Sequence, residues 1–114
     1  MANIYKNAKL DLTTNTVTTL YTVPSNSRAI VKSILVSSDS GSATTITVDL
    51  FDADPASGNK FTLFDVVDIA ANASTQLLTE PLIMLENEVL QVTAADADRL
   101  FVVASILEIN REDR

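Results

Sequence analysis

The chain of 114 residues contains no cysteine, no histidine and no tryptophan. Without cysteine, neither disulfide bonds nor thiolate metal sites can form. The sequence therefore does not indicate whether the compartment is oxidising or reducing. Without histidine, the commonest general base near neutral pH and the commonest transition-metal ligand are both missing. Catalysis by a nucleophile paired with histidine is therefore excluded. We expect no enzymatic activity and assign no catalytic residues.

Glycine and positive charge are also scarce. Gly41 and Gly58 are the two glycines, so no glycine-rich loop can cradle a phosphate, and the eight Lys and Arg residues are scattered in a chain of net charge −7. This charge repels phosphate backbones and anionic lipids, which disfavours nucleic acids and membrane surfaces as partners. No apolar run approaches the ~20 residues of a membrane span, and the N-terminus lacks a signal-peptide core. We expect the chain to start in the cytoplasm of the cell that makes it.

The acidic loops are the remaining candidates for a metal site. Residues 52–59 place Asp52, Asp54, Ser57 and Asn59 in one loop, and their oxygens are of the kind that Ca²⁺ prefers. The spacing departs from the calcium-loop pattern, because an alanine falls where a ligand should be and a proline stiffens the middle. The favoured interpretation is a soluble turn, with calcium binding as the alternative. We assign no metal ligands and no cofactor.

Apolar and β-branched residues, by contrast, are abundant, and 46% of the chain is hydrophobic. The segment 28–38 carries apolar side chains on both faces, which is typical of a central strand covered on both sides. Pro24 ends the preceding strand, since it fixes its own φ and extends the residue before it. Thr44 to Asp52 alternates apolar and polar residues with a period of two, as a half-buried strand does.

Other segments carry weaker or mixed signals. Between Leu63 and Phe64 the apolar positions change face, which predicts a β-bulge or burial on both sides. Pro81 before an apolar run at 82–85 slightly favours a helical turn there over a strand. Gly41 is expected to adopt a positive φ in the turn after residue 38. Additional strands are expected at 15–23, 60–70, 75–79, 88–94 and 99–109.

About seven to nine short strands with turn signals roughly every 8–12 residues predict an all-β fold, an antiparallel β-sandwich that is jelly-roll-like. Within this fold, residues 1–12 are expected to form an N-terminal strand or an arm that reaches a neighbouring subunit. Residues 13–110 are expected to form the β-sandwich domain, and residues 111–114 a charged C-terminal tail.

The chain has more apolar surface than one small sandwich core requires. A two-sheet sandwich has one core, and the outer face of each sheet should be polar. Strands that are apolar on both faces therefore indicate that part of an outer face is covered. Strand ends that curl over the core would explain some of this cover, and self-association is the more economical explanation. We predict an interface that includes Phe101, Val103, Leu107, Ile109, Val31 and Leu35.

The first third of the chain resembles small structural proteins of tailed bacteriophages. The residues that carry this resemblance are LYTVP at 20–24, a short polar turn, and AIVKSI at 29–34. The similarity extends over about residues 16–109, although its later part is a general β pattern. The chain departs from the family at 85–87, where Leu-Glu-Asn stands in place of the glycines of many relatives, so the type of turn before Glu88 is left open.

The resemblance implies a β-sandwich protein of the virion, assembled in the host cytoplasm and without enzymatic activity. Within that group, it favours a capsid decoration (cement) protein that binds and stabilises the outer head shell. The implied partners are the major capsid protein and further copies of the chain, with a homotrimer favoured. A tail, neck or fibre-attachment component is the alternative. A carbohydrate-binding accessory domain is a third hypothesis, weakened because Tyr5 and Tyr21 would have to supply the aromatic platform.

Overall fold

The computed structural model describes residues 2–110, and the tail expected at 111–114 lies outside the described residues. The described residues form strands joined by turns and loops, and none of them belongs to a helix that could cross a membrane. The nine strands are β1 (Ala2–Leu12), β2 (Thr18–Thr22), β3 (Ser27–Ser38), β4 (Thr44–Phe51), β5 (Lys60–Ile69), β6 (Ser74–Gln76), β7 (Leu82–Met84), β8 (Val89–Ala94) and β9 (Leu100–Asn110).

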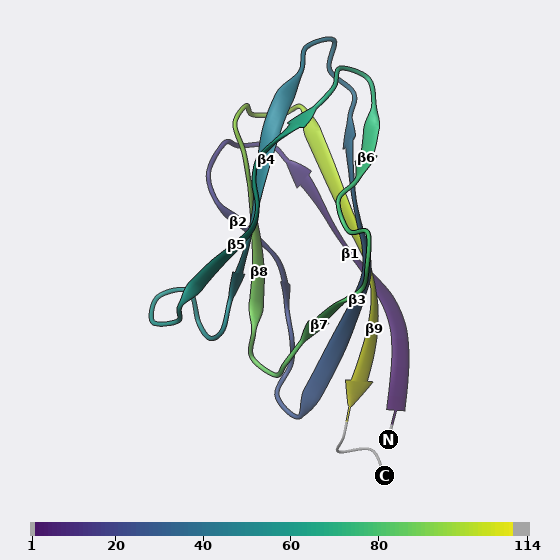
Figure 1. The fold of residues 1–114 in the computed structure, drawn as a ribbon, viewed down its shortest axis with the longest axis vertical. Coiled ribbons are helices and arrows are strands. Elements are labelled where there is room, and N and C mark those ends of the chain that lie inside the picture. The colour runs from purple at the N-terminus through teal and green to yellow at the C-terminus, as the bar shows by residue number, and fades with distance from the viewer. Residues whose placement is uncertain (1, 111–114) are drawn as a thin grey trace.

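All strand pairs are antiparallel. Strands near the two ends of the sequence pair with each other, and strands nearer its middle pair in turn. β1 pairs with β9, β2 with β8, β3 with β6 and β7, and β4 with β5. Rolling up this nested hairpin gives a five-stranded sheet in the order β1-β9-β3-β6, with β7 also on β3, and a four-stranded sheet in the order β2-β8-β4-β5 (Figure 1). The predicted all-β, jelly-roll-like sandwich is confirmed. The N-terminal segment is an edge strand of the sheet.

The core lies between the two sheets and is built from alternate residues of the long strands. In β4, Ile46 and Val48 point inwards, as the period of two predicted. In β9, Val102, Ala104 and Ile106 do the same. Each fully buried aliphatic side chain stabilises the fold by about 1.5–3 kcal/mol.

In this chain, asparagine and aspartate occupy the turn positions with a positive φ, where glycine is the usual residue. Asn26, Asn72, Asn87 and Asp98 have φ between 54° and 66°, whereas neither glycine has a positive φ. The expectation for Gly41 was therefore wrong. Asn and Asp tolerate this conformation because their short polar side chains hydrogen-bond locally. Asn87 thus forms the turn before Glu88 without a glycine.

An irregularity in the pairing of β4 with β5 confirms one prediction from the sequence. The predicted bulge in β5 is present, because the register shifts on both sides of the Val48–Phe64 pair.

The preference for a helical turn at 82–85 was wrong. Leu82–Met84 forms β7 and pairs with β3, because the open edge of β3 offers backbone hydrogen bonds that a single isolated turn cannot match.

Candidate assembly surface

A row of apolar side chains runs along β9 on the outer face of the five-stranded sheet. Phe101, Val103, Leu107 and Ile109 alternate along β9 with buried residues, so all four point away from the core. Leu35 of β3 pairs with Val103 and extends the row sideways. Phe101 and Leu35 are each 37% exposed, which is high for large apolar side chains in the centre of a sheet. These five residues, all predicted from the sequence, define what we call the apolar face.

Val31, the sixth residue of the predicted interface, is fully buried in the core. The prediction was wrong here because of a β-bulge. The register between β3 and β9 shifts between Val31 and Ser33, so Lys32 and Ser33 together face Ser105. In a regular strand Val31 and Leu35 would share a face, but the extra residue puts them on opposite faces.

Four residues missed by the sequence reasoning extend the apolar face at one end. Ile30 pairs with Leu107 and with Ile83 of β7, and Tyr5 of β1 pairs with Leu107 from the other side. Leu85 follows β7 directly. Ile83 is 58% exposed and Tyr5 75% exposed. The bulge concealed Ile30, and β7 was not recognised as a strand.

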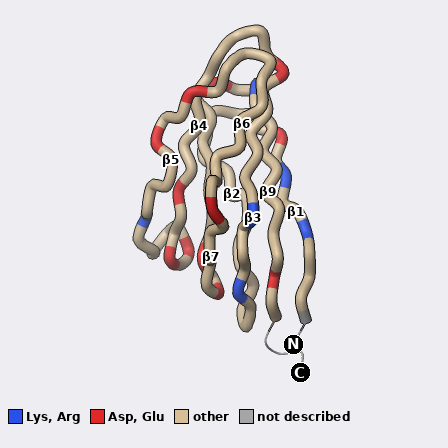
Figure 2. Tube along the Cα trace, turned by 45° about the vertical axis from the view of Figure 1, so that its right-hand side comes forward, with Lys and Arg blue, Asp and Glu red and all other residues tan. Residues whose placement is uncertain are grey.

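The charges on this face differ from those on the rest of the molecule. On the five strands of this sheet, Lys6 and Glu108 pair with each other at 3.3 Å towards the core side. The outer positions then carry Lys9, Arg28 and Lys32 against a single carboxylate, Asp11. Figure 2 shows the Lys and Arg positions of β1 and β3 along this sheet, while most Asp and Glu positions lie on the loops and the other sheet. A chain of net charge −7 therefore has one basic, apolar face.

Lys32 lies beside an aromatic residue of the apolar face. Its Nζ lies 6.0 Å from the centroid of the Tyr5 ring, within reach of a cation–π interaction. The bulge directs Lys32 outwards and β1 brings Tyr5 alongside. The basic group thus lies over an aromatic side chain, and both residues are exposed.

A buried polar cluster ties the two sheets together behind this face. The hydroxyl of Tyr21 on β2 donates a hydrogen bond to Glu108 Oε2 on β9, and both residues are buried. Lys6 Nζ donates to the same carboxylate oxygen and lies 5.8 Å from the Tyr21 ring centroid. Burial, together with the hydrogen bond to Glu108, raises the pKa of Tyr21 above its ordinary value of 10.0. The cluster therefore couples the sheets through a neutral phenol and a paired carboxylate.

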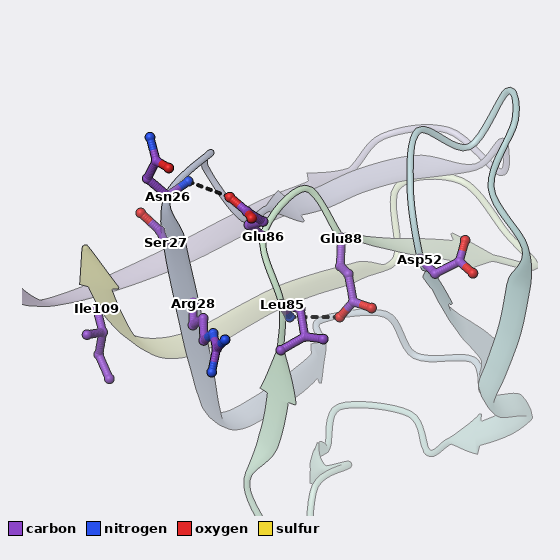
Figure 3. Close-up of a pocket in the computed structure, with 8 residues that line it drawn as sticks. All are labelled: Asn26, Ser27, Arg28, Asp52, Leu85, Glu86, Glu88 and Ile109. Atoms are coloured by element: carbon purple, nitrogen blue, oxygen red, sulfur yellow. Dashed lines mark hydrogen bonds between the residues drawn. The ribbon is translucent and has the colours of Figure 1, made fainter. Parts of the chain in front are cut away.

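A hollow of about 630 Å³ opens at the end of the sandwich, where the apolar face ends (Figure 3). Arg28, Leu85 and Ile109 line it from the five-stranded sheet, and Asp52, Glu86 and Glu88 add carboxylates. Two of these carboxylates already accept backbone hydrogen bonds: Glu86 from Asn26 at 2.7 Å and Glu88 from Leu85 at 2.8 Å. None of the eight lining residues is aromatic, so the hollow lacks the stacking platform that a sugar site would use.

The oxygens of the loop at 52–59 are used to hold the loop itself. Asp52 accepts hydrogen bonds from the backbone and side-chain nitrogens of Asn59, and these hydrogen bonds lower the pKa of Asp52. Asp54 accepts one from the backbone nitrogen of Ala56. Gly58 packs so closely that an added Cβ would lie 2.8 Å from the backbone nitrogen of Ala53. In the part of the chain that the structure describes, no cluster of three or more acidic residues is arranged to hold a metal ion.

No protein-family model and no curated protein matches the sequence. Among solved structures, the fold is similar to a chain of the T13 viral particle of IBDV, with a TM-score of 0.57 and 6% identity over 95% of this chain. A chain from the Gx strain of infectious bursal disease virus gives a TM-score of 0.56 and 7% identity over 94% of this chain. The present chain covers only 31% and 32% of those two viral chains.

A subunit of the Bacillus endospore appendages, described as disulfide-linked pili, is also similar. Its TM-score is 0.54 and its identity 11%, and the alignment covers 95% of this chain and 88% of that one. The present chain has no cysteine, so it cannot form the disulfide links named for those pili. At such low identities, what these comparisons establish for the chain is a shared β-sandwich fold.

Proposed function

We propose that this chain is a non-enzymatic structural protein of a tailed-bacteriophage virion, and specifically a capsid decoration protein that binds and stabilises the outer head shell as an oligomer. The observation that carries the proposal is the apolar face on the outer side of the five-stranded sheet. An exposed apolar surface of this kind marks a protein interface, since a sandwich needs only its inner faces to form a core.

The sequence and the fold support the same proposal independently. The segment from Leu20 to Ile34 resembles virion proteins of tailed bacteriophages, and the jelly-roll fold is shared with chains of viral particles. The absence of histidine and cysteine removes the commonest catalytic groups. The acidic outer surface of the four-stranded sheet and its loops would remain hydrated and would repel neighbouring particles.

The copy number of the protein in purified particles tests the proposal. It is measured by quantitative mass spectrometry against the major capsid protein. A decoration protein is expected at a number comparable with that of the capsid subunit. A few copies per particle would favour a tail, neck or fibre-attachment role, and absence from particles would contradict a virion role altogether.

A further inference from the structure

A second exposed apolar strip lies on the other sheet, along its edge strand. β5 pairs with β4 alone and forms the edge of the four-stranded sheet. Phe61 and Val66 of β5 are 52% and 60% exposed, and Asp65 and Asp68 of the same strand are also exposed. We call these four residues the β5 strip. They follow the open edge of the sheet, with Phe61 on its core side beside Leu50 and Asp68 on its outer side beside Thr45. The strip combines exposed apolar side chains with negative charge.

Backbone strain holds one residue of the β5 strip in solvent. Val66 has a φ of 51°, which is a genuine outlier for a β-branched residue. Its backbone nitrogen donates a hydrogen bond of 3.1 Å to the hydroxyl of Thr47, so the bulge is fixed to the neighbouring strand. Strained residues persist where the surrounding structure enforces them, and they concentrate at functional sites.

We propose that copies of this chain associate head to tail, with the β5 strip of one copy packed on the apolar face of the next. The two surfaces are complementary in two independent respects. Both expose large apolar side chains, and the Asp65 and Asp68 carboxylates match the basic groups of Arg28 and Lys32. The inference deepens the proposed function, on which its setting in the virion rests, because it specifies how the oligomer forms.

Charge and strand geometry disfavour two simpler contacts. Packing two apolar faces on each other would bring together two copies of Lys9, Arg28 and Lys32, whereas Asp11 is the one carboxylate at the outward strand positions of each copy. Edge-to-edge pairing through β5 is also disfavoured, since its two register shifts interrupt the regular row of backbone groups that another strand would need. A contact made by side chains between unlike surfaces remains.

A contact between unlike surfaces has a defined consequence for symmetry. Such heterologous contacts close into rings when the rotation between neighbours permits, and otherwise continue as open fibres. The homotrimer that the resemblance implies would be a closed ring of this type. Each copy would use both surfaces, so no apolar strip would remain exposed in the ring.

Engineered cysteines test the geometry directly, because the wild-type chain has none. Full-length V66C and L35C are purified separately, mixed, and oxidised with diamide. We expect a disulfide-linked dimer to form about tenfold faster in this mixture than with either variant alone, because the contact raises the effective concentration of the two thiols. V17C is the matched control, since Val17 is a similarly exposed valine in the loop between β1 and β2.

Three outcomes of these measurements would contradict the head-to-tail contact. Equally fast linking of L35C to itself would indicate face-to-face packing. Equal linking of V17C and V66C to L35C would indicate random collision. A wild-type chain that sediments as a monomer at about 100 µM would exclude an association of useful strength, since that concentration corresponds to only about 5.5 kcal/mol of binding free energy.

Charge reversal provides a second, independent test by sedimentation. D65K/D68K and R28E/K32E should each raise the dissociation constant about tenfold, because each places like charges opposite one another. A chain that carries all four substitutions should recover most of the affinity. D39K/D54K makes the same change in net charge as D65K/D68K, but in two loops, and should leave the affinity unchanged. Equal weakening by this control would show that net charge alone governs association and would overturn the proposal.

Failure of this inference and failure of the proposed function give different results. A monomeric chain that is nevertheless abundant on particles would remove the head-to-tail contact and keep the decoration role. A head-to-tail oligomer that is absent from particles would keep the contact and remove the decoration role.

Discussion

At the residue scale, Val66 links stability to assembly. A left-handed backbone costs an L-residue roughly 1–2 kcal/mol, and Asn tolerates this conformation far better than a β-branched residue. V66N should therefore raise the free energy of unfolding by about 1 kcal/mol in urea titrations of dilute protein. V17N, at an exposed valine without a positive φ, should give no such gain. Unchanged or reduced stability of V66N would show that the strain is relieved in another way.

The same substitution should weaken self-association, because it removes an apolar group from the β5 strip. A variant that is more stable as a monomer and poorer in assembly is the pattern expected where function uses a strained residue. Sedimentation of V66N beside the wild type checks this, and tighter association by V66N would contradict the role of the isopropyl group.

Tyr21 should make stability sensitive to alkaline pH. Burial and the hydrogen bond to Glu108 raise its pKa above 10.0 in the folded chain. Above about pH 10 the unfolded chain therefore loses a proton that the folded chain retains, and the free energy of unfolding falls as pH rises. Y21F should remove this contribution, so its stability should fall less between about pH 9 and pH 11 than that of the wild type. Parallel pH profiles for the two proteins would contradict the shift.

Near neutral pH, Y21F should instead be less stable than the wild type. The buried carboxylate of Glu108 then loses its phenol donor and keeps the hydrogen bond from Lys6. Loss of a hydrogen bond to a charged group costs about 1.5–3 kcal/mol. Urea titrations near pH 7 measure this difference.

At the element scale, the bulge in β3 decides which residues reach the surface. Lys32 is the extra residue, so removing it should leave Val31 and Ile34 pointing inwards and the ladder to β9 regular. The deletion of Lys32 should therefore fold, at a cost of at most about 2 kcal/mol. Deletion of Leu35, three positions along, should prevent folding, since it moves every later side chain of the strand to the opposite face of the sheet. Circular dichroism and thermal unfolding distinguish the two, and equal damage would contradict the assignment of the bulge.

The orientation of strand residues was predictable from the sequence where the pattern of apolar residues was sufficient to assign each side chain to a face. The alternation in β4 specified its inward residues, and the change of face between Leu63 and Phe64 indicated the bulge in β5. The bulge in β3 left no such signal, because its outward residue is a lysine in a strand that is apolar on both sides. Val31 was therefore assigned to the wrong face. β7 depended on pairing with a distant strand, which overrode the local preference for a helical turn at Pro81.

The apolar face could be predicted only in part, for a related reason. The apolar residues of β9 alternate without interruption, so their outward row was visible in the sequence. Tyr5, Ile83 and Leu85 join the apolar face only through the pairing of β1 and β7 with the inner strands. That arrangement follows from the topology, which local patterns do not specify.

At the scale of the whole molecule, two valines of the predicted interface should behave in opposite ways. V103D adds a charge to the apolar face, so it should leave the monomer folded, with a melting temperature within a few degrees of the wild type, and should prevent assembly. V31D buries an unpaired carboxylate in the core and should unfold the chain. Thermal unfolding and sedimentation of both variants check this. Loss of the fold in V103D would place that residue in the core and contradict the interface.

The nested order of strand pairing also constrains how the chain is made. The first strand, β1, has one partner, β9, and the last residues of β9 pair with the first residues of β1. During synthesis on the ribosome, β1 and the central strand β3 must wait without this partner until β9 has left the exit tunnel. The five-stranded sheet therefore cannot close before β9 has emerged, and until then the apolar strands are open to premature association.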